Sequence, residues 1–543
     1  MLKQNRLLSL CNDTTLANAV EVTSLQGREE INQGFIYLID VTSLTELSNE
    51  FKLGKELSIK LQTNETIERF FNGIIHEIHY HGATHNKHRY TIMIKSWLQL
   101  LENNTDCRLF QNQSVIDIVT SICTQHGFSA IDTSNLINVY KKIEYCTQYN
   151  ESTYNFIKRL LAKFKIHFLF LHEKNKHRLL LMDKLSTANG NNINFNDNYN
   201  KQTILTKTTI KPQVFTSNNY NYNHATLDLN TQSNREYPPL KKLACRLEHY
   251  HFPGEHLHQD DGQAFCNDKF NEINNIDYII KQCSDCNISL NQTINDANKH
   301  NVKTLRVLSI EHDCKQTPNS RSSAMKHNTH YQATVKCIDA QIALKPNHIK
   351  KPKMPGSQIA IVTGKKGHSV YADQQGRIKI RFYWDKSNSS NTNSSNWIRV
   401  SQHLAGDGYG TQFTPLVGTE VWVDFINQDP DQPIITRQAY NGLNIPVYSH
   451  NETYLTSIKS PNLEPHLPAN EIRFSDKADA EHVFINAQRD LQLLAKNNID
   501  LTTKNNEQHT IENGNYTLSA NMGEYTLHSK SITLNSGKSK IHM

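Results

Sequence analysis

The final segment of the chain, residues 470–543, does not have the pattern of a globular domain. Triplets in which two apolar residues flank a polar one recur there, namely Leu491-Gln492-Leu493, Ile499-Asp500-Leu501, Tyr516-Thr517-Leu518, Tyr525-Thr526-Leu527 and Ile532-Thr533-Leu534. Most of them lie roughly 7–10 residues apart, a spacing typical of stacked strands in a β-helix or fibre. Each triplet is too short to be a stable strand alone. We therefore expect several chains to wind together into a needle, held by apolar residues such as Leu493, Leu501, Leu518, Leu527 and Leu534.

Length and composition indicate a multidomain protein. The chain has 543 residues, more than one hydrophobic core usually holds, and a formal net charge of only +6. This balance does not favour non-specific attraction to nucleic acid or membranes. No apolar run reaches the roughly 18 residues of a membrane span, and no apolar signal-peptide core follows Met1. The ten cysteines are mostly isolated and are interpreted as reduced thiols.

Periodicity divides the chain into seven segments. Residues 1–185 have strand patterns, then a helix capped by Ser114 and another that begins near Ser152. Residues 186–240 are Asn-rich and are expected to be long loops or a polar insert, and residues 241–345 form a second α+β region with a helix after Asp261. The remaining segments are a Pro/Lys linker (346–356), a β module (357–440), a second linker (441–469) and the needle (470–543).

The β module has the clearest strand alternation. One face of a strand is expected to carry Ile378, Ile380, Phe382 and Trp384, and the other face Arg377, Lys379, Arg381 and Tyr383. Val421, Val423 and Phe425 alternate in the same way. About five such strands in roughly 85 residues are typical of a small closed barrel of the OB type.

Several longer strings resemble the VgrG family, the spike proteins of type VI secretion systems. The resemblance is carried by residues 376–385 (GRIKIRFYWD), 397–402 (WIRVSQ), 415–421 (PLVGTEV), 429–436 (DPDQPIIT) and 470–477 (NEIRFSDK). Upstream, Tyr149-Asn150-Glu151-Ser152 and the Phe252-Pro253-Gly254 turn are similar to further landmarks of the family. The order of these strings holds across nearly the whole chain.

The resemblance implies a mainly β, multidomain homotrimer. It implies a hub of barrel-like α+β domains, an OB-fold barrel and a C-terminal intertwined triple-stranded β-helix. The implied function is a structural spike, not an enzyme and without a cofactor, that is driven mechanically through a target envelope. Its implied partners are an Hcp-like tube protein, baseplate proteins, and a PAAR-like tip protein or effectors. The implied route is assembly in the cytoplasm, then secretion without a signal peptide. A prophage contractile-tail hub and spike is the alternative.

The tip of the needle is expected to dock the tip protein or an effector. The chain ends at Ile541, His542 and Met543, and no fused enzyme is expected after the needle. Three copies of His542 on a common axis would offer a metal-binding arrangement, but one histidine per chain is weak evidence and an ordinary frayed terminus is the favoured interpretation.

Two clusters are weak candidates for metal binding. The first is His249, His251, His256 and His258, of which His249 and His251 alternate on one strand face. The second is Cys283-Ser284-Asp285-Cys286 with Cys314, which lacks the clean spacing of a zinc site. A strand–turn edge and structural thiols are the simpler interpretations. A metal-dependent hydrolase built on the histidines is the enzymatic alternative.

A third alternative concerns nucleic acid. The basic face of Arg377, Lys379 and Arg381, with Tyr383 and Arg399, resembles the single-strand-binding face of some OB domains. Only one strand of the module is basic, however, and few aromatic residues accompany it. A solvated or inter-subunit face is the simpler interpretation, and we expect no nucleic-acid partner.

Overall fold

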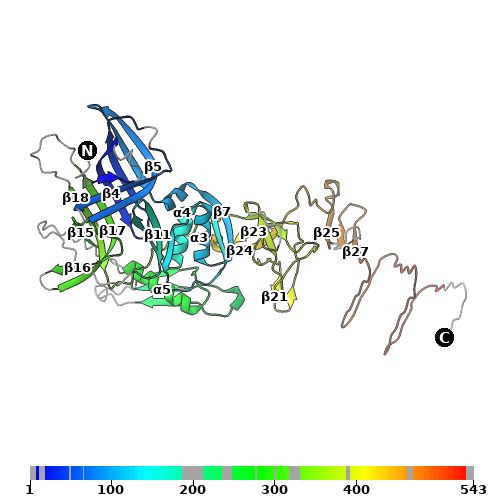
Figure 1. The fold of residues 1–543 in the computed structure, drawn as a ribbon. Helices are drawn as coiled ribbons and strands as arrows, with labels where there is room; N and C mark the ends of the chain where they lie inside the picture. Colours follow the sequence, from blue (N-terminus) through cyan, green and yellow to red (C-terminus); the bar gives the residue numbers. More distant parts are fainter. Residues whose placement is uncertain are drawn as a thin grey trace, which may run out of the picture. The chain divides into compact units, whose positions relative to one another are not determined.

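The computed structural model describes residues 8–11, 19–47, 51–64, 67–185, 212–234, 247–274, 278–298, 301–316, 330–386, 392–461 and 469–533. The chain forms two compact units, Met1–Pro446 and Val447–Met543. Both units are drawn in Figure 1.

A ten-stranded sheet joins two distant parts of the chain in the first unit. Its order is β1-β4-β5-β6-β3-β2-β17-β18-β15, with β16 paired to β17. The strands are β1 (Leu8–Leu10), β2 (Val20–Glu30), β3 (Ile36–Ser43), β4 (Glu56–Asn64), β5 (Ile67–Thr84), β6 (Lys87–Lys95), β15 (Ile279–Cys283), β16 (Thr293–Asn298), β17 (Asn301–Lys315) and β18 (His330–Asp339). Antiparallel pairing of β2 with β17 places Leu25 opposite Cys314, so the blue and green strands of Figure 1 share one sheet.

The strands predicted near the start of the chain are confirmed. In β3, Tyr37, Ile39 and Val41 are buried, and the residues between them face outward or are partly covered. This alternation places one apolar face of the sheet in the main core.

A buried polar cluster lies inside this sheet. The Arg69 guanidinium lies 3.0 Å from a Glu29 carboxylate oxygen, His312 Nε2 lies 3.1 Å from the same oxygen, and Tyr37 donates to it at 2.6 Å. Burial alone would raise the pKa of Glu29, but Arg69 and His312 hold it well below its usual range. The cluster ties β2, β5 and β17 together through a satisfied charge.

Helices and further strands follow β6 along the chain. They are α2 (Trp97–Leu100), η1 (Leu101–Asn103), β7 (Thr105–Gln113), α3 (Val115–Gln125), β8 (Ile131–Asn135), β9 (Ile143–Ser152), α4 (Thr153–Lys163), β10 (His167–Glu173) and β11 (Lys176–Met182). Both predicted helix starts are confirmed. The Ser114 hydroxyl accepts a hydrogen bond from the Asp117 amide, and the Asp117 carboxylate accepts one from the Ser114 amide. The Ser152 hydroxyl accepts a hydrogen bond from the Asn155 amide.

No helix in the described ranges is both long and apolar enough to cross a membrane.

The polar insert contains more regular structure than its composition indicates. Two strands of the insert, β12 (Val214–Ser217) and β13 (Thr231–Asn234), form a sheet with β14 (Glu248–His251) of the following region, in the order β13-β12-β14. The predicted helix is α5 (Gln259–Asn274), whose Cys266 and Phe270 pack with Phe215 of β12. The expectation of loops is therefore wrong for β12 and β13, because four-residue strands with one apolar pair leave no periodic signal. Residues 186–211 and 235–246 lie outside the described part of the chain.

The β module forms a four-stranded sheet with the order β20-β19-β23-β24. Its strands are β19 (Gln358–Thr363), β20 (Lys379–Phe382), β23 (Glu420–Phe425) and β24 (Pro433–Gln438), with a small hairpin of β21 (Ala405–Gly406) and β22 (Tyr409–Gly410). The predicted alternation is confirmed, since Ile378, Ile380 and Phe382 are buried together with Val421 and Val423. The ring of Trp384 stacks on Phe382 at 4.7 Å.

The second unit contains one three-stranded sheet, β25 (Leu455–Lys459), β26 (Glu471–Ser475) and β27 (His482–Asn486), in that order. In residues 487–533, which carry four of the apolar triplets and the first two residues of the fifth, this single chain forms no strand. That result agrees with the expectation that each triplet is too short to be stable alone.

Candidate functional site

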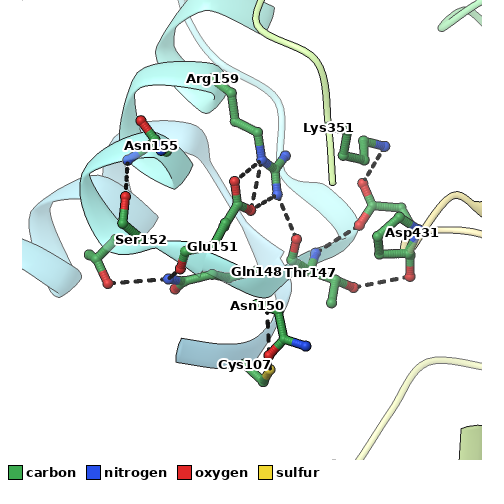
Figure 2. Close-up of polar contacts among 12 residues, drawn as sticks. Cys107, Thr147, Gln148, Asn150, Glu151, Ser152, Asn155, Arg159, Lys351 and Asp431 are labelled. Carbon is green, nitrogen blue, oxygen red and sulfur yellow. Dashed lines mark hydrogen bonds and ion pairs between the residues drawn. The ribbon is translucent and has the colours of Figure 1, made fainter. Parts of the chain in front are cut away.

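A lysine of the Pro/Lys linker forms the centre of an ionic junction in the first unit. Lys351 Nζ lies 2.8 Å and 2.9 Å from the two carboxylate oxygens of Asp429 and 2.8 Å from Asp431 Oδ2. Both aspartates belong to the turn between β23 and β24. Because Lys351 has little exposed surface, this contact fixes the linker against the β module (Figure 2).

The same turn is hydrogen-bonded to β9. The backbone amide of Thr147 donates to Asp431 Oδ1 at 2.7 Å, and the Thr147 hydroxyl donates to the Pro430 carbonyl at 3.2 Å. From the other side, Arg159 donates to the Thr147 carbonyl at 2.7 Å (Figure 2). Thr147 is therefore held by the β module and by α4 at once.

Arg159 also pairs with Glu151, as the close-up in Figure 2 shows. Its Nε and Nη2 atoms lie 2.6–2.9 Å from the Glu151 carboxylate, and both side chains are nearly buried. Burial raises the pKa of Glu151 even though Arg159 opposes that effect. Asn150, near the end of β9, is in the left-handed region with φ 45° and precedes Ser152, which caps α4. The Tyr149–Ser152 string of the sequence resemblance thus lies beside Thr147 and joins the end of β9 to α4 through the Glu151–Arg159 pair.

The charges of the junction are strongly stabilised. Burial would raise the pKa of Asp431, but the Lys351 ammonium, together with the charges of Lys163 and Arg159, outweighs burial and lowers that pKa. Conversely, the two aspartates raise the pKa of Lys351 despite its burial. A buried pair with these geometries holds two elements in one orientation, and the loss of either partner leaves an uncompensated charge.

A second contact lies beside the junction. Lys386 Nζ lies 2.8 Å from Asp106 Oδ1, Gln111 donates to the Asn393 carbonyl at 3.1 Å, and Trp384 packs edge-on against Tyr149 at 6.3 Å. The β module thus contacts β7 and β9 through charged, polar and aromatic groups.

The predicted histidines do not converge. His249 and His251 stack on Phe215, at 5.2 Å and 6.3 Å between ring centres. His256 is buried with its Nε2 2.8 Å from the Leu229 carbonyl, and His258 is exposed. Within the described ranges, no group of three or more His, Cys, Asp or Glu side chains has the arrangement of a metal site.

The predicted cysteines are buried in the main core. Cys283, Cys286 and Cys314 are nearly inaccessible and belong to the apolar cluster of the large sheet. Burial raises the pKa of Cys314 to about 12, which disfavours the reactive thiolate form.

The basic face of the β module is largely engaged by other groups. Arg377 Nε pairs with Asp373 at 2.7 Å, Lys379 donates to the Thr392 carbonyl at 2.6 Å, and the Arg399 guanidinium lies 4.1 Å from the ring centre of Tyr222. Arg381 alternates with the buried Ile380 and Phe382 in β20, as predicted, whereas Tyr383 lies in the turn after that strand and is exposed. Because Tyr222 belongs to the insert, this face is partly covered by the chain itself, which disfavours its use for nucleic acid.

The needle leucines are exposed in the single chain. Leu493, Leu501, Leu518 and Leu527 have exposed fractions of 78%, 74%, 54% and 58%. Leu534 and the predicted tip residues Ile541, His542 and Met543 lie outside the described residues. A regular series of exposed large apolar side chains is typical of a surface that another chain covers.

Three protein-family models match consecutive parts of the chain. A model described as the phage tail baseplate hub (GPD) matches residues 28–274. The type VI secretion system/phage-baseplate injector OB domain matches residues 359–440, and the bacteriophage T4 gp5 C-terminal trimerisation domain matches residues 457–540. The predicted OB module and needle therefore each coincide with a family model.

Curated relatives match over most of the chain. The type VI secretion system spike protein VgrG1c of Pseudomonas aeruginosa is 30% identical over 91% of this chain and 69% of its own length. VgrG1a of the same organism is 30% identical over 88% of this chain and 77% of its own length. The actin cross-linking toxin VgrG1 of Vibrio cholerae is 26% identical over 92% of this chain but 48% of its own length.

Solved structures share the fold. A component of the E. coli type VI secretion system, described as similar to the T4 tail proteins gp27 and gp5, gives a TM-score of 0.53 at 18% identity and covers 79% of this chain and 99% of that one. A chain of the half-lidded Francisella PdpA-VgrG complex gives 0.56 at 11% identity and covers 88% and 87%. From its identity to the curated spike proteins and from the three matched domains, this chain belongs to the VgrG family of type VI secretion system spike proteins.

Proposed function

We propose that three copies of this chain form a spike that punctures a target envelope and carries a tip protein or effector. The observation that supports this most is the series of exposed needle leucines inside the match to a trimerisation domain. Three chains wound together would bury these side chains and would leave no open sheet edge. The Lys351–Asp431 junction would hold the OB module on the hub while load passes through it.

In this proposal the role is mechanical and the chain has no catalytic centre. The energy comes from a contracting sheath. An Hcp-like tube protein contacts the hub, baseplate proteins surround it, and the tip protein or effector docks at Ile541, His542 and Met543. The chain assembles in the cytoplasm and leaves the cell with the spike, without a cleaved peptide. The seven segments of the sequence analysis correspond to hub, insert, hub, linker, OB module, linker and needle.

A prophage tail hub and spike is the second candidate, because the match to a phage tail baseplate hub model favours it. The neighbouring genes distinguish the two. Sheath, tube and ATPase genes indicate secretion, whereas capsid genes indicate a phage.

Light scattering tests the assembly. The full chain is expected to have the mass of three 62.4 kDa subunits, and a chain that ends at Pro468 is expected to be a monomer, because it lacks the needle and two strands of its preceding sheet. A monomeric full-length protein at micromolar concentration would contradict the proposal and would favour the enzymatic alternative.

A further inference from the structure

A cavity of about 120 Å³ lies beside α4 in the first unit. Its wall is built mainly by the turn between β2 and β3, by α4, by residues of β10, β17 and β18, and by residues between Leu344 and Ile349 at the start of the Pro/Lys linker. These parts are distant in sequence, so the cavity depends on the folded hub. It is separate from the ionic junction, because Lys351 and its two aspartates do not line it.

One part of the cavity wall is apolar. Leu161 of α4, Phe168 of β10, Leu308 of β17 and Leu344 line the cavity, and the first three are nearly inaccessible to solvent. A protein cavity of about 150 Å³ with apolar walls of this kind holds a benzene molecule. The cavity beside α4 therefore has room for one apolar side chain of about the size of leucine.

Three lysines line the same cavity, and their contacts are with uncharged groups. Lys158 Nζ donates a hydrogen bond to the Gln33 side chain at 2.7 Å, and Lys336 Nζ lies 3.7 Å from the ring centre of Tyr278. Lys345 is the third lysine of the wall. Among the residues that the structure describes, none of the three forms an ion pair.

The wall of the cavity favours a negative charge. Glu30 also lines the cavity, but its carboxylate pairs with Arg28 at 2.7 Å. Burial lowers the pKa of Lys158, although Glu102 and Glu30 act in the opposite direction. An anion beside Lys158 would offset the effect of burial, because an opposite charge at close range favours the ammonium form. The cavity thus combines space for one apolar group with positive charge for one anion.

We propose that this cavity binds the C-terminal residue of a partner protein. The apolar side chain of that residue packs against Phe168 and Leu308, and its α-carboxylate lies among Lys158, Lys336 and Lys345. A C-terminal residue carries its carboxylate and its side chain on the same carbon atom, so both fit one small cavity. Capture of a terminal carboxylate is a recurring mode of peptide recognition.

Other anions match the cavity less well. An internal Asp or Glu side chain, or a phosphate group, would bring the charge but would leave the apolar wall uncovered. The inference goes beyond the spike proposal and does not depend on the number of copies in the assembly. It gives the hub a second place, besides the needle, at which another protein attaches.

Fluorescence polarisation with the full-length protein tests the ligand. The probe is a fluorescein-labelled peptide of sequence Gly-Ser-Gly-Ser-Leu with a free C-terminal carboxylate. Its controls are the same peptide as a C-terminal amide and a peptide that ends in glycine. We expect saturable binding of the probe with a Kd below about 1 mM, and binding of each control at least about tenfold weaker, because each lacks one of the two recognised groups. No saturation in this range, or equal binding of the amide, overturns the inference.

A competitor distinguishes a protein terminus from a free small acid. 4-Methylpentanoate has the leucine side chain and the carboxylate but no peptide chain. Displacement of the labelled peptide that requires a higher concentration than the unlabelled peptide does supports a protein terminus. Displacement at an equal or lower concentration identifies a free carboxylic acid as the occupant and overturns the proposed partner.

Substitutions in the wall test the position of the site. Lys336→Gln with Lys345→Gln removes two ammonium groups, and we expect it to weaken binding of the leucine-ended peptide at least about tenfold. Lys350→Gln is the matched control, because Lys350 is an exposed lysine of the adjacent linker that does not line the cavity. An unchanged Kd in the double variant, or an equal loss in the control, overturns the inference.

A second variant fills the cavity without changing its charge. Ala162→Leu adds volume to the wall from α4 and keeps all three lysines. We expect it to weaken binding of the leucine-ended peptide at least about tenfold, because the added side chain occupies the space for the ligand. Thermal melting of each variant verifies that it is folded. An unchanged Kd in folded Ala162→Leu overturns the inference and leaves the spike proposal intact.

Discussion

Four needle leucines replaced by aspartate are expected to convert the trimer into a soluble monomer. The variant carries the changes in every chain, at Leu493, Leu501, Leu518 and Leu527. These side chains are more than half exposed in the single chain, so their burial depends on partner chains. Each substitution removes about 1.5–3 kcal/mol of stabilisation that burial of the leucine side chain provides. Each aspartate would also bring a charge into a low-dielectric stack, at a further cost of several kcal/mol. Light scattering of the purified variant measures the result.

The matched control adds the same charge on the other side of each strand. It replaces Gln492, Thr502, Thr517 and Thr526, which neighbour the four leucines, by aspartate. Because strand side chains alternate, these positions face solvent in a wound needle and the control should remain a trimer. A trimeric leucine variant would show that the needle is not the assembly element.

Local patterns were sufficient to predict the parts of this fold that depend on neighbouring residues. The helix caps at Ser114 and Ser152 and the buried face of Ile378, Ile380 and Phe382 are confirmed because capping and alternation act within a few residues. The needle could be predicted because its repeat is itself local.

Long-range contacts left no such signal. The pairing of β2 with β17 joins residues almost 290 positions apart, as between Gly27 and His312. The residue pattern of either strand does not identify the strand with which it pairs. The junction was missed for the same reason. In the sequence, Lys351 cannot be distinguished from the other lysines of the linker. Only the fold places two aspartates around it. The predicted tip residues Ile541, His542 and Met543 stay a prediction.

Loss of the junction lysine is expected to release the OB module from the hub. Lys351→Met keeps the length of the side chain but leaves Asp429 and Asp431 without their cation, and breaking a buried pair in this way costs about 3–5 kcal/mol. We expect earlier thermal unfolding by calorimetry and faster protease cleavage of the 346–356 linker. Lys353→Met is the control, because Lys353 is an exposed lysine of the same linker and its loss should change stability by less than about 0.5 kcal/mol.

The acid response of the junction provides an independent check. The pKa of Asp431 is lowered in the folded protein, so its stabilising contribution is present above the unfolded pKa of about 4 and is lost as pH falls through the folded value. The wild-type linker should therefore become sensitive to an acid-active protease such as pepsin below about pH 4, while Lys351→Met should be sensitive already at neutral pH to a protease active there. Adding Asp431→Asn to Lys351→Met should restore part of the lost stability, because it removes one of the two buried carboxylates that Lys351→Met leaves without a cation. An unchanged unfolding profile in Lys351→Met would show that the hydrogen bonds of Thr147 hold the module without the ion pair.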